Sequence, residues 1–352
     1  MEHIHVLIGL GAVMSLVLVL PFTVRRIEEE LEAFLLVMGT AAVTISGLWS
    51  RHLIGEALTE PLKITAAVFV FGIIFRLTRA AIHDHVNQWV RRLGPAGFVF
   101  ALVVGLGLLS SVITAIMAAL TLAEIISGLQ WDKDRERRVV ILSCYSIGLG
   151  AALTPIGEPL STIATAKLSG EPHHAGFFFL FRMLWPWVIG GILSLGVMAV
   201  WAVRRAGSSS ESGLEEDRPE TWVDVLSRTA KVYVFVAALV LLGSGFQPFA
   251  DRYLIEMPKS ALYWVNSVSA VLDNATLAAA EISPKMSLAR IEFLLMGLLI
   301  AGGMLIPGNI PNIICAAKLD IKSGAWARFA APIGLALMTI YFILMLALIR
   351  SE

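Results

Sequence analysis

A carboxylate and an amide stand side by side in an otherwise apolar stretch of the chain. Asp273 and Asn274 lie between Ser269 and Thr276. An acid at membrane depth is costly, so such residues are functional candidates. A carboxylate, an amide oxygen and main-chain carbonyls suit a small cation, and the carboxylate can take a proton when the cation leaves. A compatible alternative is that Asp273 caps the helix that follows it.

Two polar breaks interrupt other apolar stretches. Proline removes a helix donor and glycine permits a sharp turn, so a break frees main-chain carbonyls to act as ligands. An ordinary turn outside the membrane is the alternative for the first break. The candidate ligands are Thr154, Glu158, Ser161 and Thr162 in the first break and Gly308, Asn309 and Asn312 in the second. Asp273, Asn274 and Asn309 are the expected sodium ligands.

Ser111 and Thr114, at the tip of the segment 95–127, could add hydroxyl ligands. Serine and threonine in membrane helices more often bond to a main-chain carbonyl, so a structural role competes with ligation here. Glu124 and Glu281 lie near charged loops, where pairing with Arg138 and Arg290 is the expectation.

The two breaks belong to an internal repeat. Residues 157–168 align without gaps to residues 308–319, and Gly, Ile, Ala, Lys and Leu coincide. A weaker match relates the segments 111–124 and 269–281. Chance similarity between two apolar segments is the alternative. The Gly, the Pro-containing break and the Lys together favour a true repeat.

Composition places these residues in a membrane. The chain is 57% hydrophobic and 15% charged, with a net charge of zero, so nothing points to nucleic acid. Its mean hydropathy is +0.79. Long uncharged runs predict full crossings near 5–23, 32–50, 62–79, 176–203, 229–247 and 328–349. Cys144 and Cys315 fall in apolar segments and are expected to be packing residues rather than a disulfide.

Loop charges set the orientation. Basic clusters near 25–26, 76–92, 133–138, 204–231 and 318–328 should be cytoplasmic. The segments 95–127 and 258–283 must then each return to the side they left, as re-entrant hairpins. The expected fold is an all-α integral membrane protein with inverted repeats, two such hairpins and two broken helices. The expected parts are two N-terminal helices (1–61), a first repeat (62–203), a cytoplasmic linker (204–228) and a second repeat (229–352), with both termini outside.

At these motifs the chain resembles the ion transporter superfamily, which includes arsenite efflux permeases, one class of sodium/proton antiporters and divalent-anion/sodium symporters. The marks are the tip Ser269 to Thr276 and the break Gly308-Asn309-Ile310-Pro311-Asn312. Within that group it is most similar to a small family of predicted cation transporters of unsettled function. The tip of the first hairpin, Ser110 to Ala115, lacks the Asn of the family pattern. In the first break, Glu158 stands where the family usually has Asn. The resemblance implies a homodimer.

These features predict a secondary transporter in the plasma membrane. The expected activity is sodium (or other monovalent cation)/proton antiport, because acids in the site repel dianions. Sodium is the expected substrate or coupling ion, with no other cofactor. Sodium-coupled uptake of a small anion, bound at helix N-termini, is the alternative. A passive channel is a further alternative. An enzyme is not expected, because Asp273 has no second Asp and Gly243-Ser244-Gly245 has no partner base.

Overall fold

The computed structural model describes residues 2–24, 26–27, 30–129, 131–205, 222–253, 257–272 and 274–349. Asp273 and most of the expected linker 204–228 lie outside these ranges. Every regular element within them is an α-helix or a 3-10 helix. The expectation of an all-α fold is therefore confirmed for the described part of the chain.

The first half of the chain forms long helices followed by shorter pieces. They are α1 (Glu2–Thr23), α3 (Leu31–Ser46), α4 (Arg51–Ile113), α5 (Ala115–Ser127), α6 (Lys133–Ala151), α7 (Pro159–Lys167) and α8 (Phe179–Arg205). The second half repeats the change from long to short. It contains α9 (Trp222–Tyr253), α10 (Lys259–Val265), η1 (Asn266–Ala270), α11 (Asn274–Glu281), α12 (Leu288–Gly302), η2 (Ile306–Gly308), α13 (Ile310–Lys318) and α14 (Ser323–Leu348).

Local residue chemistry explains where the N-terminal helices end. Gly47 takes φ 70° at the C-cap of α3, so this helix stops short of the predicted limit at residue 50. Ser50 then caps α4 by accepting a hydrogen bond from the Leu53 amide at 3.0 Å. The crossing predicted at 62–79 is one part of α4. Gly94, with φ 70° and ψ 162°, interrupts the helical backbone of α4 before Pro95.

The apolar helices are long enough for a bilayer. Four stretches meet the requirements of length and composition for a membrane crossing: Gln88–Ile113, Phe179–Arg204, Val225–Pro248 and Ser323–Leu348. Shorter apolar helices cover His5–Pro21, Leu31–Ser46 and Ala115–Ser127. The fold is that of a helical membrane protein.

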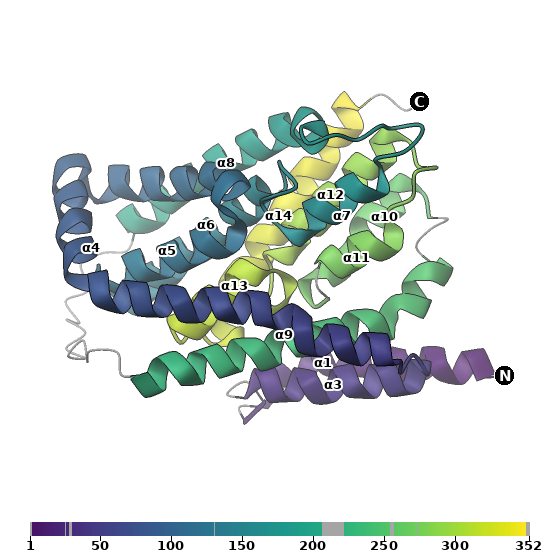
Figure 1. The fold of residues 1–352 in the computed structure, drawn as a ribbon. Coiled ribbons are helices and arrows are strands. Elements are labelled where there is room, and N and C mark those ends of the chain that lie inside the picture. The colour runs from purple at the N-terminus through teal and green to yellow at the C-terminus, as the bar shows by residue number, and fades with distance from the viewer. Residues whose placement is uncertain are drawn as a thin grey trace.

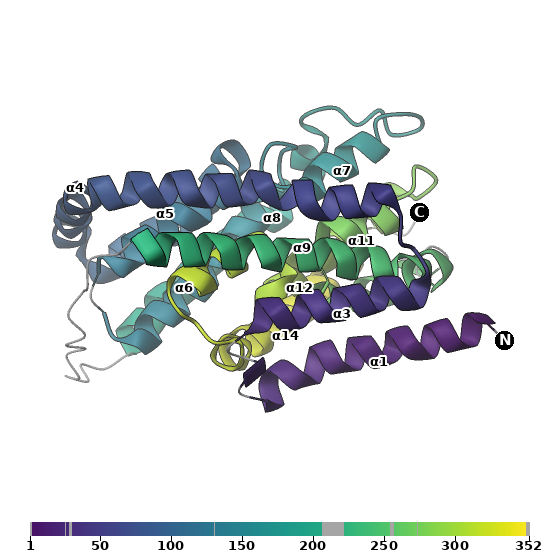
Figure 2. The same ribbon diagram turned by 60° about the horizontal axis from the view of Figure 1, so that its bottom comes forward.

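The helices form two groups. In Figure 1 and Figure 2, α1, α3, α9 and the first part of α4 lie along one side, and α5, α6, α8, α12 and α14 lie behind them. Glycines bring α3 and α9 close together. A Cβ atom at Gly39 would lie 2.9 Å from the Ala238 carbonyl oxygen, and one at Gly245 would lie 2.6 Å from the Ala42 Cβ. Small residues of this kind are typical of helix contacts in membranes.

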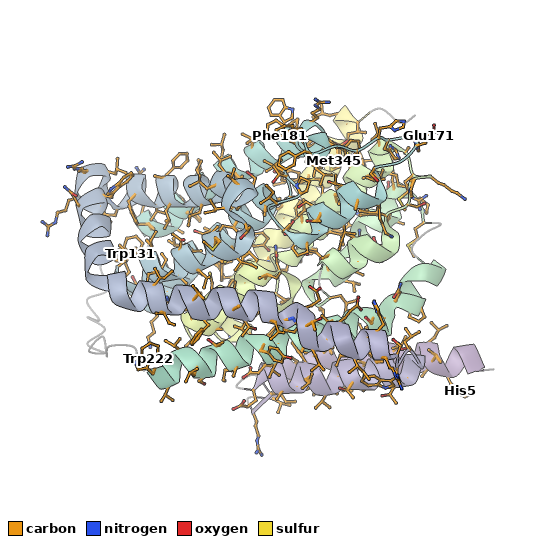
Figure 3. All side chains as sticks on the ribbon, viewed as in Figure 1. His5, Trp131, Glu171, Phe181, Trp222 and Met345 are labelled. Carbon is orange, nitrogen blue, oxygen red and sulfur yellow. The ribbon has the colours of Figure 1, made fainter. Side chains whose placement is uncertain are left out.

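The two ends of the bundle separate the loops that the charge pattern assigns to opposite sides. Both chain ends lie at the right of Figure 1. In Figure 3, His5 and Glu171 lie at this right-hand end, whereas Trp131 and Trp222 lie at the left. Figure 1 also places α5 in the left half of the bundle and α11 in the right half. The two short helices α5 and α11 therefore lie in opposite halves of the bundle in this view.

Candidate ion-binding site

The first tip, between α4 and α5, is held to the first break, between α6 and α7. Thr114 has φ 75°, and its Oγ1 accepts a hydrogen bond from the Met117 amide at 3.3 Å. The next amide, of Ala115, donates to the Gly157 carbonyl at 2.8 Å. The Thr154 hydroxyl donates to the Ser111 carbonyl. Tip and break are thus one hydrogen-bonded unit.

Ser161 holds the first break in shape. Its hydroxyl lies 2.7 Å from the Thr154 carbonyl oxygen, 2.8 Å from that of Glu158 and 3.4 Å from that of Ala151. Glu158 precedes α7 with extended backbone angles, φ −156° and ψ 162°. Because Ser161 is fully buried and its hydroxyl is used by the backbone, it stabilises the break rather than offering a free ligand.

Asn312 makes matching contacts in the second break, between α12 and α13. Its Nδ2 donates to the carbonyls of Gly302 at 2.8 Å and Leu305 at 2.9 Å. Asn309 precedes α13 with φ −155° and ψ 146°, nearly the angles of Glu158. The helices α7 and α13 are also equivalent in sequence: they start at 159 and 310 and end at 167 and 318, in both cases 151 positions apart.

The two tips contact the broken helices through equivalent serines. Ser110 Oγ donates to the Ile147 carbonyl at 2.9 Å, and Ser269 Oγ donates to that of Leu298 at 3.3 Å. The acceptors, 147 and 298, are again 151 positions apart. Both serine hydroxyls therefore have a structural role, because a buried hydroxyl group needs an acceptor and each finds one in a main-chain carbonyl.

Main-chain oxygens converge on Gly308 in the second break. A Cβ atom there would lie 2.5 Å from the Gly302 oxygen, 2.8 Å from the Ser269 oxygen and 3.0 Å from the Ala270 oxygen. Only glycine leaves room for this approach. Three carbonyls from a tip and a helix end are a concentration of hard oxygen ligands of the kind that binds small cations.

Three asparagines add polar atoms to this region. Asn274, Asn309 and Asn312 are all buried. Neither Asn274 Nδ2 nor Asn312 Oδ1 has a hydrogen-bond partner in the described part of the chain. Asn309 reaches toward the first half, because a Cβ atom at Gly148 of α6 would lie 2.6 Å from its Nδ2. The second tip and break thus carry an amide NH₂ and an amide oxygen that have no partner among the described residues, beside the carbonyls.

The halves exchange contacts at the short helices. Helix α5 packs against α13, and α11 packs against α7. Glu124 forms a buried ion pair with Lys318, the last residue of α13, and not with the expected Arg138. Lys167, the last residue of α7, donates to the Ile282 carbonyl at 3.2 Å. Each tip is therefore braced by the broken helix of the other half.

The predicted ligands divide into two groups. Ser111, Thr154, Ser161 and Thr162 donate to main-chain oxygens of the first tip and break, and Thr114 accepts from an amide. Ser269, Asn274, Gly308, Asn309 and Asn312 line the second tip and break, and Glu158 is buried at the start of α7. Asp273 and the Thr276 side chain lie outside the described part. Hydroxyls thus hold the first unit, whereas the second retains unpaired polar atoms.

Several positions escaped the sequence reasoning. Tyr145 is buried, donates to the Ala330 carbonyl at 2.9 Å and lies against Gly303 and Gly334. Ser143 Oγ, also buried, has no partner among the described residues. The sequence signal for close packing here was the pair of glycines Gly148 and Gly150 near the end of α6, directly before the first break.

Conventional metal chemistry is not found in the described part of the chain. No group of three or more His, Cys, Asp or Glu side chains comes together there. This search concerns acidic, His and Cys ligands, whereas the atoms gathered at the second break are carbonyl and amide groups. Neutral oxygens of this kind suit a hard cation better than a transition metal.

The class defined by this fold is an all-helical membrane protein with two interrupted helices in its core. The chain belongs to the family described as "Protein of unknown function (DUF1646)", which it matches over residues 7–348. A comparison with curated proteins finds no match.

Proposed function

We propose that this protein is a secondary active transporter, a sodium (or other monovalent cation)/proton antiporter that works by alternating access. The observation that carries the proposal is the recurrence of one hydrogen-bonded break at Ser161 and Asn312, 151 positions apart. Broken helices arranged in related halves are the usual architecture for binding an ion near the middle of the membrane.

The proposal treats the halves as inverted repeats with re-entrant hairpins. Two helices, α8 and α9, and one returning hairpin separate the two broken helices. Counting α8, α9 and the first broken helix as crossings gives an odd number, so the second copy would run in the opposite sense. The position of α5 and α11 in opposite halves of the bundle supports this arrangement. By the positive-inside rule, the basic loops favour a cytoplasmic location for the Trp131 end, with both termini outside.

Asp273 is the proposed shared site for cation and proton. It directly precedes Asn274 and follows Ala270 by three positions, so the chain connects it to the carbonyls around Gly308. When ionised, the carboxylate completes an oxygen site for the cation; when protonated, it lowers the charge of the site and releases the cation. Competition for one carboxylate couples the two fluxes.

A cation fits this region better than an anion. Helix N-termini favour negative charge, which would support sodium-coupled anion uptake. However, Glu158 stands at the start of α7, where its charge opposes an anion. Glu158 and Asp273 bring one acid to each of the two units. We therefore propose cation/proton exchange first, with anion symport as the outcome to be tested against it.

The decisive experiment measures proton flux driven by sodium, lithium or potassium in proteoliposomes. Wild-type protein should move protons on addition of at least one cation, and Asp273→Asn should abolish this movement. The matched control is Asp320→Asn, because Asp320 is an exposed acid next to α13. Cation-driven proton flux that survives in Asp273→Asn would refute the mechanism. Cation uptake that requires a co-added anion and moves no proton would favour symport.

A further inference from the structure

Glu281, at the end of α11, is a buried carboxyl that the proposed mechanism does not use. Its side chain is 1% exposed. It lies beside the Asn266 amide, yet neither of its oxygens has a hydrogen-bond partner in the described part of the chain. Asn266 is equally buried; its Nδ2 donates to the Leu294 carbonyl at 3.3 Å, while its Oδ1 has no partner among the described residues. Within the described ranges, these three acceptor oxygens therefore have no donor at hydrogen-bond distance.

Both side chains line a pocket of about 180 Å³ between α1, α9 and the second tip. The other lining side chains are apolar, and include Leu10, Met14 and Phe246. Gly11 of α1 also lines the pocket, and a Cβ atom there would meet no other atom within 4 Å. The pocket thus combines an apolar wall with one polar corner.

The lysine that contacts the end of α11 does not hydrogen-bond to that corner. Lys167 approaches the end of α11, where its Nζ donates to the main-chain oxygen of Ile282 at 3.2 Å. The Lys167 ammonium therefore contacts Ile282, the residue after Glu281, but forms no hydrogen bond with the Glu281 carboxyl. Within the described part of the chain, the neighbouring Asn266 amide, which already donates to the Leu294 carbonyl, is the donor group next to these acceptors.

We infer that this pocket binds a small alkylammonium ion. An ammonium group has three N–H donors and one positive charge, which match two carboxylate oxygens and one amide oxygen. The alkyl chain would lie against the apolar wall, where burial of each CH₂ group is favourable. A neutral alcohol would match the wall but not the charge, and an inorganic cation would leave the apolar wall unused.

Pairing also explains how an acid can be tolerated there. An ionised carboxyl without a partner is costly to bury, but a hydrogen-bonded counter-ion offsets that cost. The site uses the side chains of Glu281 and Asn266 and does not depend on antiport activity. It assigns to the protein a second ligand, an organic cation, held between α1 and the second tip.

The test uses the full chain, purified in a neutral maltoside detergent, with n-hexylammonium chloride as probe and n-hexanol as its neutral counterpart. Binding is measured by titration calorimetry. We expect saturable binding of hexylammonium, and a loss of about 10- to 100-fold in Glu281→Gln, the range expected for hydrogen bonds to a charged group. Hexanol should bind weakly and equally to both proteins.

A second variant keeps Glu281 and blocks the space instead. Gly11→Leu should abolish hexylammonium binding, because Gly11 lines the pocket and nothing lies within 4 Å of a Cβ atom there to hold the added side chain away from it. Asp273→Asn should bind hexylammonium normally. Loss of antiport in this variant can therefore be distinguished from loss of alkylammonium binding. Unchanged hexylammonium affinity in both Glu281→Gln and Gly11→Leu would overturn the inference. Equal affinities for hexanol and hexylammonium would do the same.

Discussion

The side chains of Ser161 and Asn312 contact main-chain carbonyl oxygens at equivalent positions in the two halves of the chain. Each reaches the main-chain oxygen seven residues before it, Thr154 at 2.7 Å and Leu305 at 2.9 Å. Each also faces the oxygen ten residues before it, at 3.4 Å and 2.8 Å. A hydroxyl in one half and an amide in the other therefore stabilise the same local backbone shape.

Asn312→Ala should destabilise the protein by about 2 kcal/mol, because two buried carbonyls lose their donor. Ser161→Ala should destabilise it in the same direction. The control is Ser169→Ala, since the exposed Ser169 hydroxyl donates only to the nearby Ala166 carbonyl. Denaturant-induced unfolding of the purified variants measures the differences. Equal stability of Asn312→Ala and Ser169→Ala would contradict this account of the break.

Gly308→Ala should abolish cation-driven proton flux even if the variant still reaches the membrane. A methyl group would meet the Gly302 oxygen at 2.5 Å and the Ser269 oxygen at 2.8 Å, so the carbonyls around the break would have to move. Gly170→Ala is the matched control, because nothing lies within 4 Å of its Cβ position. Proteoliposome flux compares the two. Normal flux in Gly308→Ala would show that the close approach is not required.

Removing one partner of the buried Glu124–Lys318 pair should be costly. Glu124→Gln leaves the Lys318 ammonium buried without its counter-ion, for which the expected loss of stability is about 3–5 kcal/mol. Replacing both residues, as Glu124→Gln with Lys318→Met, should recover much of that loss. Lys322→Ala is the control, since its pair with Asp320 is exposed and should contribute less than about 1 kcal/mol. A double variant as unstable as Glu124→Gln would argue against a buried pair.

Glu136 should make stability depend on pH. It precedes the apolar stretch that begins at residue 139, and burial raises the pKa of its carboxyl to about 7, more than its hydrogen bond from the Trp131 amide lowers it. The folded state therefore holds this proton more tightly than the unfolded state. The contribution is fully present below pH 4.5 and is lost as the pH rises toward about 7.

The corresponding measurement is the melting temperature of wild type and Glu136→Gln between pH 4.5 and 8. The advantage of Glu136→Gln over wild type should grow with pH across this window and level off above about pH 7. Glu171→Gln, which changes an exposed acid in a loop, serves as the control. A difference between Glu136→Gln and wild type that does not vary with pH would show that the carboxyl has an ordinary pKa.

Much of the helical layout could be predicted from the sequence, because hydropathy and glycine or proline positions act locally. The breaks near 152–158 and 303–309 fall where the Pro and Gly residues stand. Helix ends that depend on the backbone conformation of a single residue were harder to predict. The end of α3 depends on Gly47 in the left-handed region, and the predicted crossing 62–79 proved to be part of a helix that starts at Arg51.

Partner choice in the core could not be predicted in the same way. Glu124 was expected to pair with Arg138, 14 positions later, but its partner is 194 positions away on α13. No local pattern encodes such a contact. The roles of the hydroxyls were similarly open: Ser161 and Thr154 looked like ligands, but their donors are used by carbonyls that only the fold brings near.

The exchange of contacts between α5 and α13, and between α7 and α11, has a consequence for biosynthesis. Glu124 leaves the ribosome long before Lys318, 194 positions later, so its partner is absent while most of the chain is made. Until α13 is synthesised, the surface of α5 that packs against it therefore stays uncovered. Two separately synthesised halves should recognise each other through these same surfaces, because each supplies the brace that the other lacks.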